Sequence, residues 1–206
     1  MRDTNKKLAA WLENGESRIG QVVVSRRGIG WELRHEADAQ LTALTEHRGA
    51  NAARALANLD DQGAYRPLKT APNLRRGWVL LAEDLTQLRK AIEAFYPAMV
   101  GVWLAKCAGK LEAVPLRETL SRQTGMYRVT QKISDEQAQG LIGRTCDPQR
   151  GCLKTILWQI APEVPITSLP PEKFRAPEEN HLPLWCQEAC NLLVAGARKV
   201  VKGEAE

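Results

Sequence analysis

The chain has 206 residues, of which 44% are hydrophobic and 26% are charged, with a net charge of +5. This composition supports a hydrophobic core in one large domain or two small ones, and it excludes a wholly disordered chain. No stretch approaches the roughly 18 apolar residues of a membrane span, and the polar start "MRDTNKKLAAWLENGES" lacks the apolar region of an export signal. We therefore expect a cytoplasmic protein without membrane contact, whose thiols stay reduced.

The positive charge is spread along the chain rather than gathered in one block. A nucleic-acid-binding protein usually shows a basic stripe with aromatic residues or a known motif. Neither is present, so nucleic acid is not an expected partner. The small positive excess fits an ordinary solvated surface or an acidic ligand.

The first half of the chain begins with a predicted β-hairpin. Residues 20–38, "GQVVVSRRGIGWELRHEAD", combine β-branched valines, punctuating glycines and a period-two alternation. Residues 38–60 carry no strand signal and are expected to form a helix, or a helix pair broken near Gly49. Residues 65–81 hold two prolines and a glycine, which predicts an ordered loop leading to a short strand or turn.

Residues 82–107 carry a clear helical pattern. Pro97 should end or kink this helix. A domain boundary is expected near residue 100, with an α+β domain over 1–100 and a helical domain over 101–206. The apolar residues that recur at helical spacing are Leu85, Leu88, Ile92 and Phe95.

The second half is expected to be mainly helical, so the fold class of the chain is predicted as α+β with mainly helical structure. Residues 111–125 should form a helix with Pro115 in its first turn and Gly125 at its end. Ser134 and Gln137 make a capping-box pattern at the start of the next helix.

The last 55 residues or so contain a long proline-rich loop between two predicted helices. A short apolar helix is expected at 152–160 and a strong final helix from 185 onward, "WCQEACNLLVAGARKVV". The loop, residues 161–183, holds six prolines. It is too long to be a simple connection in a compact domain.

Four of the five cysteines flank this loop in two pairs. "DPQRG" separates Cys146 from Cys152, and "QEA" separates Cys186 from Cys190. The i, i+4 spacing of the second pair would place both sulfurs on one face at the start of the final helix, where the helix dipole favours thiolates. Cys152 would similarly lie near the start of the short helix. The four thiols could thus form one metal site.

Two inorganic groups are compatible with four thiolates. A [4Fe–4S] cluster takes four cysteines, and it is wide enough to tolerate this loose spacing. Structural zinc usually has two to four residues between paired ligands, in compact knuckles. Without a metal, the cysteines would be small buried apolar residues. Cys107 lies on the apparent helix of residues 100–111 and is expected to be a core thiol; the alternative is a fifth, substitute ligand.

Arg122 and Arg128 flank the polar turn "RQTGMYR". Guanidinium groups bind carboxylates in a bidentate manner, so this turn could bind a polycarboxylate. A helix end with ordinary salt bridges would have the same sequence. No catalytic triad or dyad can be identified, and the three histidines are expected to be ordinary packing or surface residues: His35, His47 and His181.

Several stretches resemble a known family: "RQTGMYR", "CDPQRGCLKTILW", "PLWCQEACNLLVAGAR" and "YRPLKTAPNLRRGW". They are similar to the carboxy-terminal region of bacterial sirohydrochlorin cobaltochelatase-like proteins, where a stabilising domain and a [4Fe–4S]-binding domain follow a chelatase module. The resemblance covers most of the chain. It implies a stabilising domain over 1–100, a cluster-binding domain over 101–206, and no place for Cys107. The cluster ligands it implies are Cys146, Cys152, Cys186 and Cys190.

The resemblance also implies a role in tetrapyrrole chemistry. No chelatase module is apparent, so we expect no metal insertion by this chain alone. The expected function is a [4Fe–4S] accessory or electron-transfer protein related to sirohydrochlorin or cobalamin-type metallation, with a tetrapyrrole or a chelatase-like protein as partner. The alternatives are an iron–sulfur redox or iron sensor that controls a partner, and a zinc-stabilised interaction protein. Candidate contacts for tetrapyrrole carboxylates are Arg75, Arg76, Arg122 and Arg128.

Overall fold

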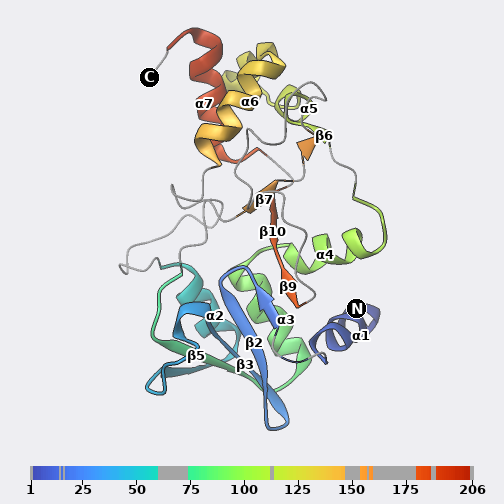
Figure 1. The fold of residues 1–206 in the computed structure, drawn as a ribbon, viewed down its shortest axis with the longest axis vertical. Coiled ribbons are helices and arrows are strands. Elements are labelled where there is room, and N and C mark those ends of the chain that lie inside the picture. Colours follow the sequence, from blue (N-terminus) through green and yellow to red (C-terminus); the bar gives the residue numbers. More distant parts are fainter. Residues whose placement is uncertain are drawn as a thin grey trace. The chain divides into compact units, whose positions relative to one another are not determined.

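The computed structural model places the chain in two compact units (Figure 1). It describes residues 2–13, 15, 17–59, 74–111, 114–146, 154–156, 158–159, 180–186 and 189–204. The first unit comprises 1–68, 72–111 and 176–184, and the second comprises 69–71, 112–175 and 185–206. The fold is α+β and mainly helical, as the sequence predicts.

A six-stranded mixed sheet forms the centre of the first unit, in the order β4-β5-β3-β2-β1-β9. The predicted hairpin is present, because β2 and β3 pair in antiparallel register from Val22↔His35 to Arg27↔Gly30. β4 is parallel to β5, and β9 is parallel to β1. The strands are β1 (Ser17–Ile19), β2 (Val22–Arg27), β3 (Gly30–His35), β4 (Thr45–Arg48), β5 (Trp78–Ala82) and β9 (His181–Leu182).

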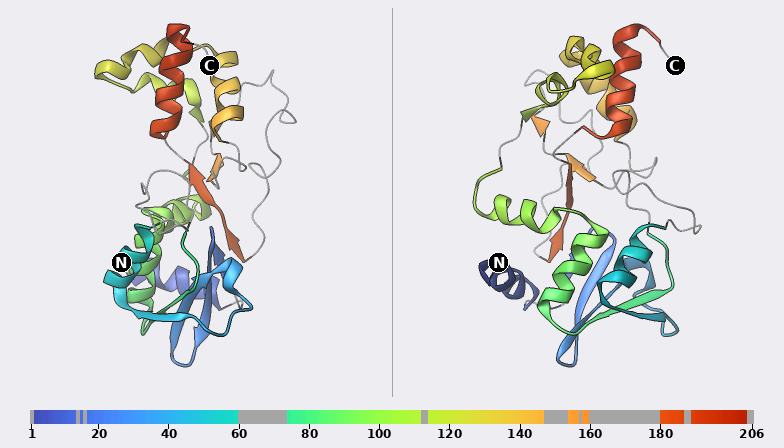
Figure 2. Two further views of the ribbon diagram at one scale, coloured as in Figure 1. Left: turned by 90° about the vertical axis from the view of Figure 1, so that its left-hand side faces the viewer. Right: turned by 180° about the vertical axis from the view of Figure 1, so that it is seen from behind.

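Helices cover one face of this sheet. Figures 1 and 2 show α2 and α3 on the same side of the strands. The rings of Trp78 in β5 and Phe95 in α3 stack with centroids 5.1 Å apart. The predicted 82–107 pattern forms two helices that separate at Pro97, as expected. The helical elements of this unit are α1 (Arg2–Leu12), η1 (Glu36–Asp38), α2 (Gly49–Ala57), α3 (Leu85–Phe95) and α4 (Met99–Cys107).

The prediction that residues 38–60 contain no strand is wrong. Thr45–Arg48 form β4, an edge strand whose residues are mostly exposed. Such a strand lacks the apolar alternation by which strands are identified in a sequence. Of the expected helix or helix pair, only the part after Gly49 is present, as α2, which begins at Gly49.

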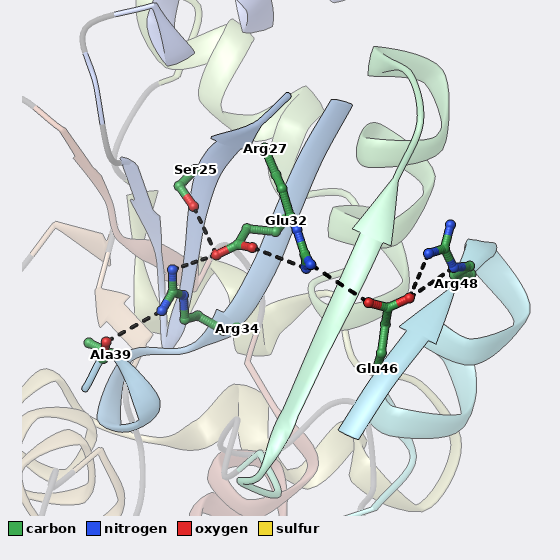
Figure 3. Close-up of polar contacts among 7 residues, drawn as sticks. All are labelled: Ser25, Arg27, Glu32, Arg34, Ala39, Glu46 and Arg48. Carbon is green, nitrogen blue, oxygen red and sulfur yellow. Dashed lines mark hydrogen bonds and ion pairs between the residues drawn. The ribbon is translucent and has the colours of Figure 1, made fainter. Parts of the chain in front are cut away.

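Charged side chains alternate with the buried residues of β3 and extend toward β4 (Figure 3). Glu32 contacts Arg27 and Arg34, and Glu46 contacts Arg27 and Arg48. Partly exposed pairs of this kind contribute little stability each, about 0–1 kcal/mol. Because the acidic and basic groups pair with one another, this row offers little net charge to a partner.

The turn between β1 and β2 requires glycine for two reasons. Gly20 has φ +55°, and a Cβ there would lie 2.8 Å from Cδ1 of Leu184 and 2.9 Å from Cζ of Tyr96. Gly28, at the next hairpin, has φ +59° with nothing within 4 Å of such a Cβ. Both the backbone conformation and the packing therefore require glycine at position 20. At position 28 only the backbone conformation requires it.

We expect Gly20→Ala to lower the free energy of unfolding of the first unit by about 2–5 kcal/mol. Roughly 1–2 kcal/mol comes from the left-handed backbone and the rest from displaced packing. Gly28→Ala is the matched control, with an expected loss of about 1–2 kcal/mol. Urea unfolding followed by circular dichroism measures both, and equal losses in the two variants would contradict the packing argument.

The second unit is a helical assembly with two short strand pairs. α6 begins with the predicted capping box, in which the Gln137 N–H donates to Ser134 Oγ and the Ser134 N–H donates to Gln137 Oε1. β6 pairs with β8, and β7 with β10. The elements are β6 (Val114–Pro115), α5 (Leu116–Ser121), η2 (Gly125–Lys132), α6 (Asp135–Thr145), β7 (Lys154–Ile156), β8 (Trp158–Gln159), β10 (Leu184–Cys186) and α7 (Asn191–Lys202).

Three predictions about this unit are wrong. The helix expected over 111–125 spans only Leu116–Ser121, and Gly125 opens η2 instead. Strands β7 and β8 replace the short apolar helix, because a short apolar run with β-branched residues suits a strand equally well. The final helix begins at Asn191 rather than at 185. Residues 160–179 of the proline-rich stretch, and Cys152, lie outside the described residues.

Within the described ranges, no helix has both the length and the apolar character needed to cross a bilayer.

Candidate metal centre

Three of the five cysteines meet in the hydrophobic core of the second unit. The exposed fraction is 4% for Cys146 and 7% for Cys186, and Cys190 is partly buried against the same core. We call this group the cysteine core. Its other buried members are Leu116, Leu120, Ile133, Ala138, Leu141, Ile142, Leu193, Val194 and Ala197.

Each of these cysteines stands at the end of a different element. Cys146 is the C-cap of α6, and its N–H donates to the Ile142 carbonyl at 2.8 Å. Cys186 is the last residue of strand β10, and Cys190 is the N-cap of α7. A helix end, a strand end and a helix start thus deliver three sulfurs to one apolar region, although Cys146 lies 40 residues before Cys186 in the sequence.

The local geometry of the second pair differs from the prediction. Cys186 and Cys190 do not share a helix face, because Cys186 belongs to β10. Only Cys190 stands at a helix N-terminus, and its side chain makes no capping hydrogen bond. The N–H groups of the first turn and the positive end of the helix dipole suit an anionic metal–thiolate group beside this residue.

The donor set fits an iron–sulfur cluster. Cysteine thiolates are the ligands of [4Fe–4S] clusters, and the apolar neighbours of Cys146 and Cys186 would limit solvent access, which tunes such centres. In the part of the chain that the structure describes, no three His, Cys, Asp or Glu side chains form a site for a single metal ion. A cubane is wider than one ion, so its ligands need not converge on one point.

Cys107 is not a core thiol, contrary to the prediction. It is exposed at the end of α4, in the first unit. The buried residues of that helix are Val100 and Val102, which lie earlier in its sequence. Cys107 is not among the residues of the cysteine core.

The four candidate arginines are exposed and fall into two pairs. Arg75 and Arg76 precede β5 in the first unit, and Arg122 and Arg128 belong to the second unit. Nη2 of Arg122 lies 2.7 Å from Oε1 of Glu118. Arg122 therefore already has an ion-pair partner. Any added carboxylate would have to share Arg122 with Glu118.

The histidines occupy separate environments. His35 is buried, and its Nδ1 accepts a hydrogen bond from the Ala37 N–H at 3.0 Å. Burial lowers the pKa of His35, and the nearby Asp38 and Glu36 oppose this effect. Nδ1 of His181 lies 3.1 Å from Nη2 of Arg18.

Two buried polar residues that the sequence analysis missed shape the segment before β5. Oε1 of Gln21 accepts from the Leu74 N–H at 3.1 Å. Oδ2 of Asp38, a residue that is 1% exposed, accepts from the Gly77 N–H at 2.7 Å. Both bonds join residues far apart in the chain, so no local pattern could have revealed them.

Comparison with known protein families finds one match for each half of the chain. Residues 4–107 match the DR2241 stabilising domain, and residues 108–199 match a 4Fe-4S iron-sulfur cluster binding domain. No curated protein matches.

Among solved structures, the chain is similar to DR2241 from Deinococcus radiodurans. That protein is described as multi-domain, with structural similarity to chelatases and two additional novel domains. The identity is 28% and the TM-score 0.73, and the match covers 98% of this chain and 42% of that one. This chain thus spans less than half the length of DR2241.

The four cysteines predicted as ligands all fall within residues 108–199, the range of the cluster-binding match. The resemblance seen in the sequence is confirmed, and so is the [4Fe–4S] cluster as the cofactor. The chain belongs to the DR2241 stabilising domain family and continues into a 4Fe-4S iron-sulfur cluster binding domain.

Proposed function

We propose that this protein is a [4Fe–4S] accessory or electron-transfer protein that serves tetrapyrrole metallation of the sirohydrochlorin or cobalamin type. The observation that carries the cluster role is the meeting of Cys146, Cys186 and Cys190 in one core, inside the range matched to a cluster-binding domain. With Cys152 as the fourth ligand, they would supply the four thiolates that a cubane needs.

The protein side of this function is to hold and shield the cluster. A bound [4Fe–4S] cluster supplies one-electron redox chemistry, with a potential set partly by solvent exposure. The burial of Cys146 and Cys186 keeps water from their sulfurs. Cys190 is the least buried of the three, so a redox partner would approach most closely near the start of α7.

The tetrapyrrole context is supported by likeness to a protein that itself resembles chelatases. Sirohydrochlorin is rich in carboxylates, and exposed arginines are suitable contacts for them. Arg122 and Arg128 are exposed residues of the second unit, which is the unit that would carry the cluster. We therefore propose them as tetrapyrrole contacts.

Protein purified without oxygen should be brown and contain about four irons per chain. Iron and sulfide analysis with a visible spectrum checks this result. A colourless preparation that keeps stoichiometric zinc after anaerobic reconstitution with iron and sulfide would overturn the cluster role and favour a zinc-stabilised interaction protein.

The same cluster-loaded sample should bind sirohydrochlorin, and Arg122→Gln/Arg128→Gln should weaken that binding at least about tenfold, which corresponds to about 1.4 kcal/mol. The expected loss of affinity is no larger because Arg122 is exposed and already paired with Glu118. Arg89→Gln/Lys90→Gln, which removes the same charge from α3, is the control. No binding by the parent, together with cluster-dependent binding to DNA or a regulator, would favour the sensor alternative.

A further inference from the structure

A cavity of about 280 Å³ lies in the first unit, between α2 and the residues that lead into β5. Apolar side chains make up much of its wall, among them Ala52 and Leu56 of α2 and Trp78 of β5. Arg75, Arg76 and His47 also line it. The cavity therefore combines an apolar wall with a strongly basic edge.

The two arginines of this edge differ from four other arginines of the unit. Arg18, Arg27, Arg34 and Arg48 each form an ion pair with a glutamate. Among the described residues, Arg75 and Arg76 form no ion pair, and both are exposed. Two adjacent guanidinium groups without a carboxylate partner are free to bind an external anion.

The backbone that carries these arginines is fixed on both sides. The Leu74 N–H is bound by Gln21, and the Gly77 N–H by the buried carboxylate of Asp38. The Gly77 carbonyl accepts from the Thr45 N–H at 3.0 Å, which ties the segment to β4. A fixed segment loses less conformational freedom when a ligand binds, so these contacts preorganise the basic edge.

We propose that this cavity binds a small organic carboxylate with an apolar, preferably aromatic, body. The body would lie against Ala52, Leu56 and Trp78, and the carboxylate would bind between Arg75 and Arg76. The cavity volume suits a small aromatic acid rather than a whole tetrapyrrole macrocycle. The proposal narrows the ligand chemistry at Arg75 and Arg76, and it does not depend on the cluster.

Two probes of nearly the same shape, one anionic and one neutral, test this site: 2-naphthoate and 2-naphthamide. Calorimetric titration of the full chain should show one naphthoate site, and naphthamide should bind at least about tenfold more weakly. Arg75→Gln/Arg76→Gln should weaken naphthoate binding at least about tenfold, or about 1.4 kcal/mol, and leave naphthamide binding unchanged. Ala52→Leu should weaken both probes, because it fills the apolar wall.

Arg89→Gln/Lys90→Gln is the matched control, since it removes two positive charges from α3 in the same unit. It should change naphthoate affinity less than about threefold, the size expected of screened, long-range charge effects. Equal binding of the two probes, an unchanged affinity in a folded Arg75→Gln/Arg76→Gln variant, or no binding by the parent would overturn the proposal. Binding should be the same with and without the cluster, so failure of the cluster role leaves this test intact.

Discussion

Cys146→Ser and Cys186→Ser should each reduce the iron content from about four per chain to near zero, whereas Cys107→Ser should leave it unchanged. A serine oxygen is a shorter and harder ligand than a thiolate, so it binds iron of a cubane poorly. The two cysteines are 4% and 7% exposed and surrounded by apolar side chains, so solvent cannot readily supply a replacement ligand. Iron and sulfide analysis after anaerobic reconstitution measures the loss.

The substitution series also separates the ligands from the spare thiol. Cys152→Ser and Cys190→Ser are expected to lower cluster occupancy as well, which would complete the proposed set of four. Cys107 is the control because it is exposed, lies in the first unit and is not part of the cysteine core. If Cys107→Ser bleached the protein and Cys146→Ser did not, the ligand set would be wrong.

The elements that could be predicted from the sequence are those with a local signal. The β2–β3 hairpin follows from valine-rich alternation around glycines, and the start of α6 follows from Ser134 and Gln137. β4 could not be predicted, because an exposed edge strand is defined by its pairing with β5, which comes about 30 residues later in the sequence. β7 and β8 could not be predicted either, because the short apolar stretch that contains them would suit a helix as well.

The sequence singled out Cys146, Cys186 and Cys190, which meet in one core, but it did not predict the elements that bring them there. The residue types and the family resemblance together singled out the cysteines. The i, i+4 spacing suggested one helix face, yet Pro183 precedes strand β10, and the helix begins only after Cys190. The anchoring of the backbone around Arg75 and Arg76 could not be predicted either. Gln21 and Asp38 act there through hydrogen bonds to backbone groups that are distant in the sequence.

Removal of the cluster should destabilise the second unit and spare the first. Bound metal would join the end of α6, the end of β10 and the start of α7, whose cysteines lie in one apolar core. Metal–thiolate binding can supply about 10–16 kcal/mol in small zinc domains, as much as the whole stability of a typical domain, about 5–15 kcal/mol. The core of the second unit should therefore depend on the cluster for much of its stability.

Hydrogen exchange measured by mass spectrometry on cluster-loaded and cluster-free protein tests this expectation. Amides of α6 and α7, such as the Val194 N–H that donates to the Cys190 carbonyl at 3.0 Å, should lose protection by at least about 100-fold, or about 2.8 kcal/mol. Amides of β2, β3 and α3 should change less than about threefold, because the buried side chains of the first unit form their own core. An equal loss in both units would mean that the cluster stabilises the chain as a whole, and no loss in α6 and α7 would show that the cysteine core is stable without metal.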